Sequence, residues 1–361
     1  MLGIHICNLF AFYSFIAVYV LPAGCMPASS LHILYVALQS RGILTLTFDP
    51  SKSVQTSLEI LDTNTDAGFM PGWLTDGGDK IYSISRTYFP TNAFLSGENG
   101  IIGEASYLFK YNLSHPGPGT NGSQIQSNPH EAIFDPSGQY MFVNDRGADL
   151  IYVYHVDGPY NVTRISTVEL PPGTGPRHTT FRVFNSTRTF MYLVSELDNT
   201  VRVFTLDGVC NDEREPTAHP SSLNIVLRQT ASTLGPGSSR TSPNDTFLAS
   251  EVALSNDGKF AYVSNRATKT LSSDTLAVYS VHPNIGNDSA HLVYLGQNDT
   301  YGKIPRHFSV SPDPETRYVA VANERDASTG FMMEIKGNIS FGAFDVTQNL
   351  GPAAVIWEKQ P

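Results

Sequence analysis

The sequence of 361 residues predicts an all-β protein, a seven-bladed β-propeller. Three observations lead to this prediction. A unit of short apolar runs and polar turns recurs along the chain, and its runs are rich in aromatic and β-branched residues. Beyond the N-terminus no long apolar stripe has helical spacing. The 29 Gly and 23 Pro are typical of a chain with many turns.

Each copy of the unit opens on polar side chains, passes through a short apolar run and a turn, and ends a second apolar run in a polar cluster. The four clear copies begin at Pro129, Pro176, Ser250 and Pro305. The two longer intervals contain loop material: residues 211–245 are rich in Asn, Asp, Pro, Ser and Gly, and residues 269–273 are expected to form a long turn. The underlying unit is therefore about 45–50 residues, the size of a four-stranded propeller blade.

The N-terminal third carries weaker copies, such as the hairpin-like pair 34–37 and 44–49. About 335 residues follow the N-terminal segment, and about 48 residues per blade gives seven blades. The tail 351–357 is predicted to be one more inner strand. We expect it to share a blade with the N-terminal strands and to close the ring, which leaves few exposed edges. The prediction is a single propeller domain over 26–361.

The first residues of the chain predict a secreted protein. Residues 9–21 are almost wholly apolar and are followed by Pro22 and several small residues. This pattern is typical of a secretory signal peptide, which we place at 1–25 with cleavage near 24–28. The alternative is a membrane anchor, but the apolar run is short for a span. The mature chain is then expected to be extracellular or associated with a cell wall, with no membrane span.

Sequons for N-linked glycosylation support secretion, because a glycan needs an exposed loop in a secreted chain. The eight Asn-X-Ser/Thr sites are Asn112, Asn121, Asn161, Asn185, Asn244, Asn287, Asn298 and Asn338. Such a chain is expected to be a glycoprotein.

Charge and cysteine content exclude several classes. A formal net charge of −10 argues against nucleic acid and anionic membrane surfaces as partners. The three cysteines, Cys7, Cys25 and Cys210, allow at most one disulfide and form no metal signature. No Gly-rich phosphate loop or dinucleotide fingerprint is present, so we expect neither a cofactor nor a metal.

Alignment of the four copies brings polar residues into phase, and equivalent positions on propeller blades face a common axis. The first aligned position holds His130, Arg177, Ser250 and Arg306, and the second holds Glu131, His178, Glu251 and His307. After the second run the alignment matches Asp145, Glu196, Asn265 and Asn323, with Arg146 and Arg266 one residue later. A channel with these groups would attract a small anion and could move protons.

Each of these positions also has a purely structural interpretation. A polar residue at the start of a strand often bonds its own backbone in a turn. Arg146 fits a solvated ion pair, and Glu131 and Glu251 fit charges at the edge of a ladder. Cationic residues nevertheless recur in phase in three copies, which turn chemistry alone does not require. This recurrence favours a shared site.

Several motifs taken together resemble one family. They are His130-Glu-Ala-Ile-Phe-Asp-Pro, Gly175-Pro-Arg-His, Glu196-Leu-Asp-Asn, Ser264-Asn-Arg-Ala and Pro305-Arg-His. The chain resembles, from about residue 128 onward, the seven-bladed lactonase family, which includes bacterial-type 6-phosphogluconolactonase and fungal 3-carboxy-cis,cis-muconate cyclase. The resemblance implies the catalytic set His130, Arg177, Glu196 and Arg266. It also implies a substrate-binding set of His178, Arg306 and His307.

The resemblance implies two enzyme classes, a muconate cycloisomerase (an intramolecular lyase) and a lactone hydrolase, both acting on a small carboxylate or lactone without a cofactor. Arg177 and Arg266 would clamp a substrate carboxylate. Glu196 and His130 would transfer protons, and Arg306 would add anion binding or oxyanion stabilisation. The alternative class is a non-catalytic secreted cell-wall glycoprotein, an adhesin or antigen with host or cell-wall glycans or proteins as partners.

Overall fold

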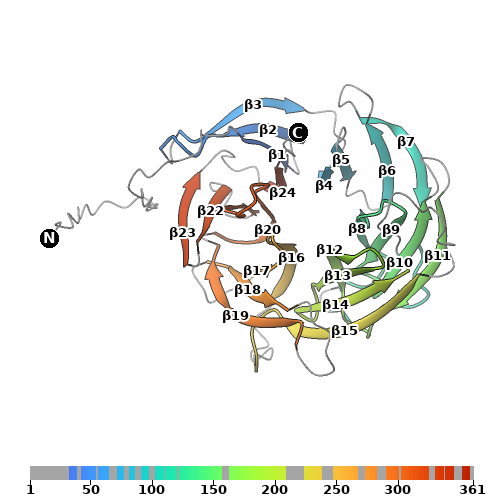
Figure 1. The fold of residues 1–361 in the computed structure, drawn as a ribbon. Coiled ribbons are helices and arrows are strands. Elements are labelled where there is room, and N and C mark those ends of the chain that lie inside the picture. Colours follow the sequence, from blue (N-terminus) through green and yellow to red (C-terminus); the bar gives the residue numbers. More distant parts are fainter. Residues whose placement is uncertain are drawn as a thin grey trace.

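A computed structural model describes the chain between residues 32 and 357. The described residues are 32–38, 42–53, 56–64, 71–76, 81–85, 91–96, 102–109, 111–119, 122–156, 162–208, 223–237, 247–266, 273–282, 290–300, 302–324, 330–336, 338–344 and 352–357. Their regular elements are β-strands, and the sheets form a β-propeller, which confirms the predicted all-β class (Figure 1). In these residues no helix is long and apolar enough to cross a membrane. The predicted signal peptide and all three cysteines lie outside them.

Five sheets of the described chain have four antiparallel strands each. One joins the chain ends in the order β24 (Pro352–Trp357), β1 (His32–Leu38), β2 (Gly42–Phe48) and β3 (Leu58–Asn64). The second contains β8 (Pro129–Phe134), β9 (Tyr140–Asp145), β10 (Leu150–Val156) and β11 (Val162–Glu169). The third contains β12 (Pro176–Asn185), β13 (Arg188–Ser195), β14 (Thr200–Asp207) and β15 (Asn224–Ser232).

The two remaining four-stranded sheets follow the same order along the chain. One contains β16 (Leu248–Leu254), β17 (Phe260–Arg266), β18 (Thr275–Val281) and β19 (Leu292–Asp299). The other contains β20 (Pro305–Val310), β21 (Tyr318–Asn323), β22 (Gly330–Lys336) and β23 (Asn338–Phe344). Two further sheets have two strands each, β4 (Pro71–Asp76) with β5 (Ile81–Ser85), and β6 (Thr91–Ser96) with β7 (Ile102–Phe109).

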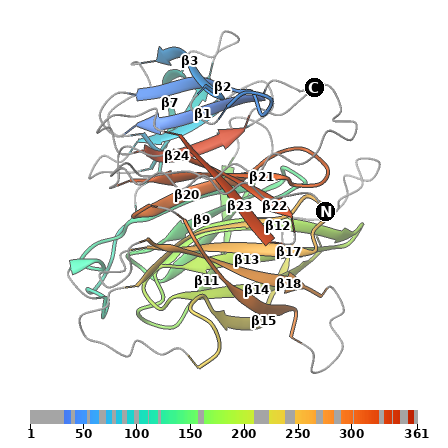
Figure 2. The same ribbon diagram turned by 90° about the vertical axis from the view of Figure 1, so that its left-hand side faces the viewer.

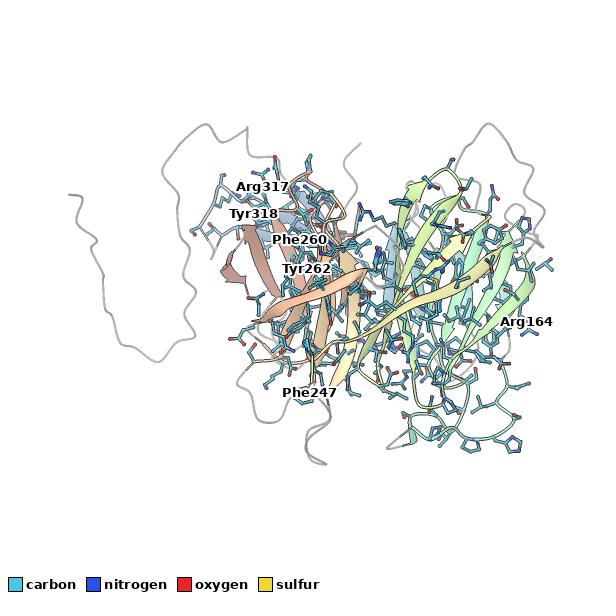
Figure 3. The ribbon with its side chains drawn as sticks, turned by 60° about the horizontal axis from the view of Figure 1, so that its bottom comes forward. Arg164, Phe247, Phe260, Tyr262, Arg317 and Tyr318 are labelled. Carbon is cyan, nitrogen blue, oxygen red and sulfur yellow. The ribbon has the colours of Figure 1, made fainter. Side chains whose placement is uncertain are left out.

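In each four-stranded sheet one end strand (β24, β8, β12, β16 or β20) lies towards the middle of the molecule and the other lies towards its rim (Figure 1). The inner strands contact one another in the order β4, β24, β20, β16, β12 and β8. Burial follows this radial order, because β9 is buried along its whole length, whereas β11 alternates between half-buried and exposed positions. Arg164 on β11 lies at the rim, over the ring of Tyr152 at 5.6 Å (Figure 3).

The core is a series of apolar clusters between adjacent sheets. Phe190 and Tyr192 on β13 pack against Val263 on β17 and Tyr279 on β18, and all four side chains are fully buried. Tyr262 belongs to the next cluster, with Phe308 of the following sheet (Figure 3). Burial of each such side chain stabilises the fold by roughly 1.5–3 kcal/mol. Sheet-on-sheet packing of this kind fixes where each inner strand begins, and the site depends on those beginnings.

The two ends of the chain share one sheet. Strand β24 pairs antiparallel with β1, with Val355 opposite Val36 (Figures 1 and 2). The indole Nε1 of Trp357 donates a hydrogen bond to the carbonyl of Ser309 at 3.2 Å and ties β24 to β20. The count of seven blades and the closure of the ring stay predictions.

Candidate functional site

A β-bulge near the start of four inner strands carries the site residues. The shifts of register lie between Pro129 and Glu131, Pro176 and His178, Ala249 and Val252, and Pro305 and His307. A bulge leaves a residue outside the ladder and changes the direction of its side chain. Two successive side chains can then both point to the interior rather than to opposite faces of the sheet. Arg177 and His178 are accordingly 0% and 1% exposed.

The turn before β12 is held by the hairpin of the neighbouring sheet. Asp149 accepts hydrogen bonds from the backbone N–H groups of Gly173 at 2.7 Å and Gly175 at 2.6 Å. Gly175 has φ +62°, and a Cβ there would lie 2.5 Å from Cγ of Leu197. Glycine is therefore required on both counts. This turn sets the position of Arg177 two residues later.

The strand register corrects one part of the sequence alignment. Pro129 lies opposite Asp145, and Pro176 lies opposite Ser195, not Glu196. Glu196 is therefore equivalent to Arg146, one residue beyond the strand, and not to Asp145. Val194 lies opposite His178 as Asn144 lies opposite Glu131, so matching Val194 to Val143 at the ends of the apolar runs places this position one residue off.

Glu196 lies among three guanidinium groups, which come from three different sheets. Its Oε1 is 2.5 Å from Nη1 of Arg146, and its Oε2 is 3.0 Å from Nε of Arg177 and 2.5 Å from Nη2 of Arg266. Burial alone would raise the pKa of Glu196, but Arg266, Arg146 and Arg177 outweigh burial and hold this pKa well below its usual range. Glu196 is a carboxylate at any physiological pH, which favours a role in holding the arginines over proton transfer.

Positive charge exceeds negative charge around Glu196. Arg306 adds a fourth guanidinium, which is buried, with Nη1 3.2 Å from Oε2 of Glu324. Burial first, and then the neighbouring Arg266 and Arg306, lower the pKa of Arg177. Four arginines thus face the two carboxylates of Glu196 and Glu324 in this part of the described chain.

Several guanidinium nitrogens of this cluster are buried and lack a hydrogen-bond partner among the described residues. They are Nε of Arg146, Nη2 of Arg177, Nε of Arg266, and Nε and Nη2 of Arg306. A buried N–H without an acceptor is costly, and a charged one more so. An anionic ligand would supply the missing acceptors. We name these residues the arginine cluster: Arg146, Arg177, Arg266 and Arg306 around Glu196.

A second group of side chains lies directly beside the arginine cluster. Nδ1 of His178 is 2.7 Å from Oε2 of Glu251, and Nε2 of His178 is 3.0 Å from Nδ1 of His130. Nε2 of His307 is 3.3 Å from the same oxygen of Glu251. Arg177 joins the two groups, because its Nη1 is 3.0 Å from Nδ1 of His178.

The two glutamates that the sequence also allowed at ladder edges are buried. Glu131 is 1% exposed and Glu251 is 4% exposed. Burial raises the pKa of Glu251 to about 8, although Arg177 counteracts it. Burial and the nearby Glu251 raise the pKa of Glu131 well above its usual range, and Asn144 donates to Glu131 at 2.8 Å. Both glutamates were left out of the predicted site, because a sequence does not show whether a carboxyl group is buried. The one sign in the sequence was their position in the repeat, in phase with His178 and His307.

The structure brings all seven predicted catalytic and substrate-binding residues into these two groups: His130, Arg177, His178, Glu196, Arg266, Arg306 and His307. The aligned polar residues at the strand ends have structural roles instead. Asn265 and Asn323 donate to the carbonyls of Thr233 and Thr300, at 2.8 Å and 3.1 Å. Asp145 accepts from the loop before β8, including the N–H of Asn128 at 2.8 Å.

The predicted sequons differ in how far the structure describes them. Asn112 and Asn185 are exposed, and Asn298 is half-buried in β19. Asn338 is the first residue of β23. The other four lie outside the described residues: Asn121, Asn161, Asn244 and Asn287. In the described part of the chain no group of three or more His, Cys, Asp or Glu side chains is arranged to hold a metal ion.

The chain is similar to known proteins over most of its length. Residues 91–336 match the family model described as lactonase, 7-bladed beta-propeller. The 6-phosphogluconolactonase of Formosa agariphila is 26% identical over 274 residues, which are 72% of this chain and 68% of that protein. The 6-phosphogluconolactonase of Bacillus subtilis is 26% identical over 240 residues, which are 63% of this chain and 58% of that protein.

A solved structure of similar fold is the periplasmic gluconolactonase of Pseudomonas aeruginosa. Its TM-score is 0.65 at 19% identity, over 92% of this chain and 100% of that chain. An identity this low shows the fold alone. The match of the family model to more than half of the chain confirms the resemblance that the motifs indicated.

Proposed function

Because this chain belongs to the seven-bladed β-propeller lactonase family, we propose that it hydrolyses a small lactone that carries a carboxylate or phosphate group. One observation carries the proposal. The arginine cluster combines an excess of positive charge with buried N–H groups that lack an acceptor in the described chain. Guanidinium groups bind carboxylate and phosphate oxygens in bidentate fashion. The matched relatives named 6-phosphogluconolactonase support a sugar lactone with an anionic substituent.

The residues of the site have separate roles in this hydrolysis. Arg177, Arg266 and Arg306 hold the anionic group and stabilise the oxyanion that forms when water attacks the lactone carbonyl. Glu196 keeps the guanidinium groups together, since its carboxylate contacts Arg177 and Arg266 directly. Proton transfer falls to His130, because Glu196 stays ionised. Neither a metal nor a cofactor enters these steps.

We also propose the finer architecture that the sequence predicted, seven blades in a ring closed between β24 and β1. The pairing of these two strands and the description of the family support it. Muconate cyclisation would use the same arginine cluster on a carboxylate substrate. We place hydrolysis first because the matched relatives carry lactonase names.

The test is a substrate panel with purified full-length protein: 6-phosphoglucono-δ-lactone, glucono-δ-lactone and 3-carboxy-cis,cis-muconate. We expect saturable hydrolysis of the anionic lactone above its spontaneous rate. Arg266→Gln should raise KM by about 10–100-fold, since it removes a charge-assisted hydrogen bond. The matched control is Arg317→Gln, because the side chain of Arg317 is 34% exposed and its guanidinium pairs with Asp313 and Glu315 among the described acidic groups (Figure 3).

Two results would contradict the proposal. One is that no lactone is hydrolysed faster than in buffer, and the other is that Arg266→Gln matches the wild type in KM and kcat. Turnover of the muconate alone would establish the cyclase instead. No turnover, together with no thermal stabilisation by any anion of the panel, would favour the non-catalytic glycoprotein.

A further inference from the structure

Four side chains, one from each of the inner strands β8, β12, β16 and β20, form a continuous series of short contacts. It runs from His307 to Glu251 at 3.3 Å, from Glu251 to His178 at 2.7 Å, and from His178 to His130 at 3.0 Å. His130 is the more exposed of the two ends, at 8% against 5% for His307, and His178 between them is 1% exposed. A series of this kind can transmit a proton if its members have the right tautomers.

The backbone of β24 fixes the tautomer at the far end. The N–H of Val355 donates a hydrogen bond to Nδ1 of His307 at 3.3 Å. A neutral imidazole that accepts at Nδ1 carries its proton on Nε2. Nε2 of His307 therefore donates towards Oε2 of Glu251. A proton on Oε2 of Glu251 is then directed to Nδ1 of His178, 2.7 Å away.

The guanidinium of Arg177 keeps the middle of the series neutral. Its Nη1 lies 3.0 Å from Nδ1 and 3.2 Å from Nε2 of His178. The lone-pair directions of the two ring nitrogens diverge. Because Nη1 of Arg177 is almost equally far from both nitrogens, it lies over the face of the imidazole ring. Burial, and then the charge of Arg177, lower the pKa of His178 well below its usual range. His178 thus carries one proton, on one nitrogen or the other.

We infer that His130, His178 and Glu251 form a proton relay in which the protonation of Glu251 decides whether Nε2 of His130 presents a lone pair or an N–H. The inference rests on the proposed function for its catalytic part. With Glu251 as a carboxylate, His178 donates from Nδ1 to Glu251, His130 donates from Nδ1 to His178, and Nε2 of His130 is the acceptor. With Glu251 protonated, every bond of the series reverses and Nε2 of His130 is a donor.

The two states supply both halves of lactone hydrolysis. As the water oxygen bonds to the lactone carbonyl carbon, the water proton moves to Nε2 of His130. The proton of Nδ1 of His130 moves to His178, and the proton of Nδ1 of His178 moves to Glu251. When the ring C–O bond breaks, the leaving alkoxide takes the proton from Nε2 of His130 and the series returns to its first state. Water and lactone give one hydroxy acid, with no proton gained or lost by the protein.

The surroundings of Glu251 set the pH at which the relay changes state. Charged or titratable groups face it from three strands: Arg177 and His178 on β12, His307 on β20, and Glu131 on β8. Burial raises the pKa of Glu251 to about 8 against the effect of Arg177. Burial, with Arg177 and Arg306, lowers the pKa of His307 to about 3, so His307 stays neutral. Glu251 is the member that titrates near neutral pH, while His178 and His307 are positioning residues.

The tautomers can be measured without any substrate. In protein labelled with ¹⁵N at histidine, we expect His307 to carry its proton on Nε2 at both pH 6 and pH 9. His130 and His178 should change from Nε2–H to Nδ1–H over the same range. Glu251→Gln should abolish the change, and the matched control Glu315→Gln, at an exposed carboxyl, should retain it. Constant tautomers in the wild type would overturn the relay, and this readout does not depend on the variant's folding.

The pH profile of lactone hydrolysis tests the catalytic part. In the wild type, kcat/KM should rise through an apparent pKa near 8, and Glu251→Gln should lose this limb. Its kcat should fall by about 100-fold or more with KM within about threefold, as for a lost general base. An unchanged profile in an active variant would refute the relay. Switching tautomers in a protein without any lactone turnover would refute the proposed function and leave the relay standing.

Discussion

Two buried glutamates of the site differ in their surroundings and therefore in their protonation. Glu196 is held as a carboxylate by three guanidinium groups, whereas burial raises the pKa of Glu251 to about 8 against the effect of Arg177. His178 and His307 contact the carboxyl group of Glu251. Two carboxyl groups whose pKa values differ in this way suit different tasks. At this scale Glu196 fixes cationic groups, and Glu251 is the group that can gain or lose a proton.

Glu196→Gln should leave Arg146, Arg177 and Arg266 without their shared counter-charge. Removing one partner of a buried ion pair costs about 3–5 kcal/mol of unfolding free energy. We expect a loss of this size in urea denaturation of the variant. Sodium sulfate should restore more stability to the variant than sodium chloride at equal ionic strength, because sulfate can occupy the cluster. A variant as stable as Glu315→Gln, with the same response to both salts, would contradict this account.

The sequence located the cationic residues because their motifs are local. Gly175-Pro-Arg-His and Pro305-Arg-His are contiguous, and each lies at the start of an inner strand. Glu251 follows a serine rather than an arginine, so its motif gave no such signal. Whether a glutamate is buried against two histidines depends on which sheets pack together. This part of the site could not be predicted from residue types.

At the scale of the strand, the β-bulges convert a repeat in sequence into a site in space. The apolar runs predicted the strands correctly, since alternation and β-branching reflect burial on a sheet. A bulge adds one residue to one strand and has no distinct composition here. It explains why two successive residues face inwards. Glu196 was aligned one position away from Arg146 for another reason, because the apolar run of β13 ends one residue nearer the end of its strand than that of β9.

The turn before β12 offers a test of how this strand is positioned. Gly175→Ala places a residue at φ +62° and brings its Cβ to 2.5 Å from Leu197. Gly138→Ala is the matched control, because Gly138 has φ +70° and no heavy atom within 4 Å of the added Cβ. The control should lose about 1–2 kcal/mol of unfolding free energy from backbone strain alone. Gly175→Ala should lose clearly more, and its kcat/KM should fall because Arg177 follows two residues later.

Equal losses of unfolding free energy in the two glycine variants would mean that Leu197 moves aside at no cost. In that case the turn would not be what positions Arg177. The Leu197→Ala background separates the two contributions, since it should reduce the excess cost of Gly175→Ala while leaving its backbone strain.

For the whole molecule, the sequence repeat predicted the propeller class, and the family match agrees with it. The period alone does not establish the number of blades, because loops of unequal length separate the copies. In the described chain five sheets have four strands and two sheets have two. The shared sheet of β24 and β1 depends on the tail, whose apolar run was visible in the sequence.

Secretion and glycosylation are proposals that concern the whole molecule. The apolar run at 9–21 and the exposed sequon at Asn185 support them. Oδ1 of Asn185 accepts hydrogen bonds from the N–H of Thr187 at 3.0 Å and from its hydroxyl at 3.2 Å. This turn presents the amide on an exposed hairpin between β12 and β13. When the full chain is expressed in a eukaryotic host, we expect it in the medium, with its N-terminus near 24–28.

Enzymatic removal of N-glycans should lower the mass of the secreted protein, and Thr187→Ala should remove one glycan, whereas Thr187→Ser should keep it. The two variants differ only in the hydroxyl that the sequon requires. Protein that stays in the cells at the full mass of 361 residues, with no mass change on deglycosylation, would refute secretion.

A glycan on that hairpin would point outwards, because Asn185 ends the exposed half of β12 while Arg177 lies in its buried half. Glycosylation and lactone binding can therefore coexist, and the Thr187→Ala variant should retain the wild-type kcat/KM.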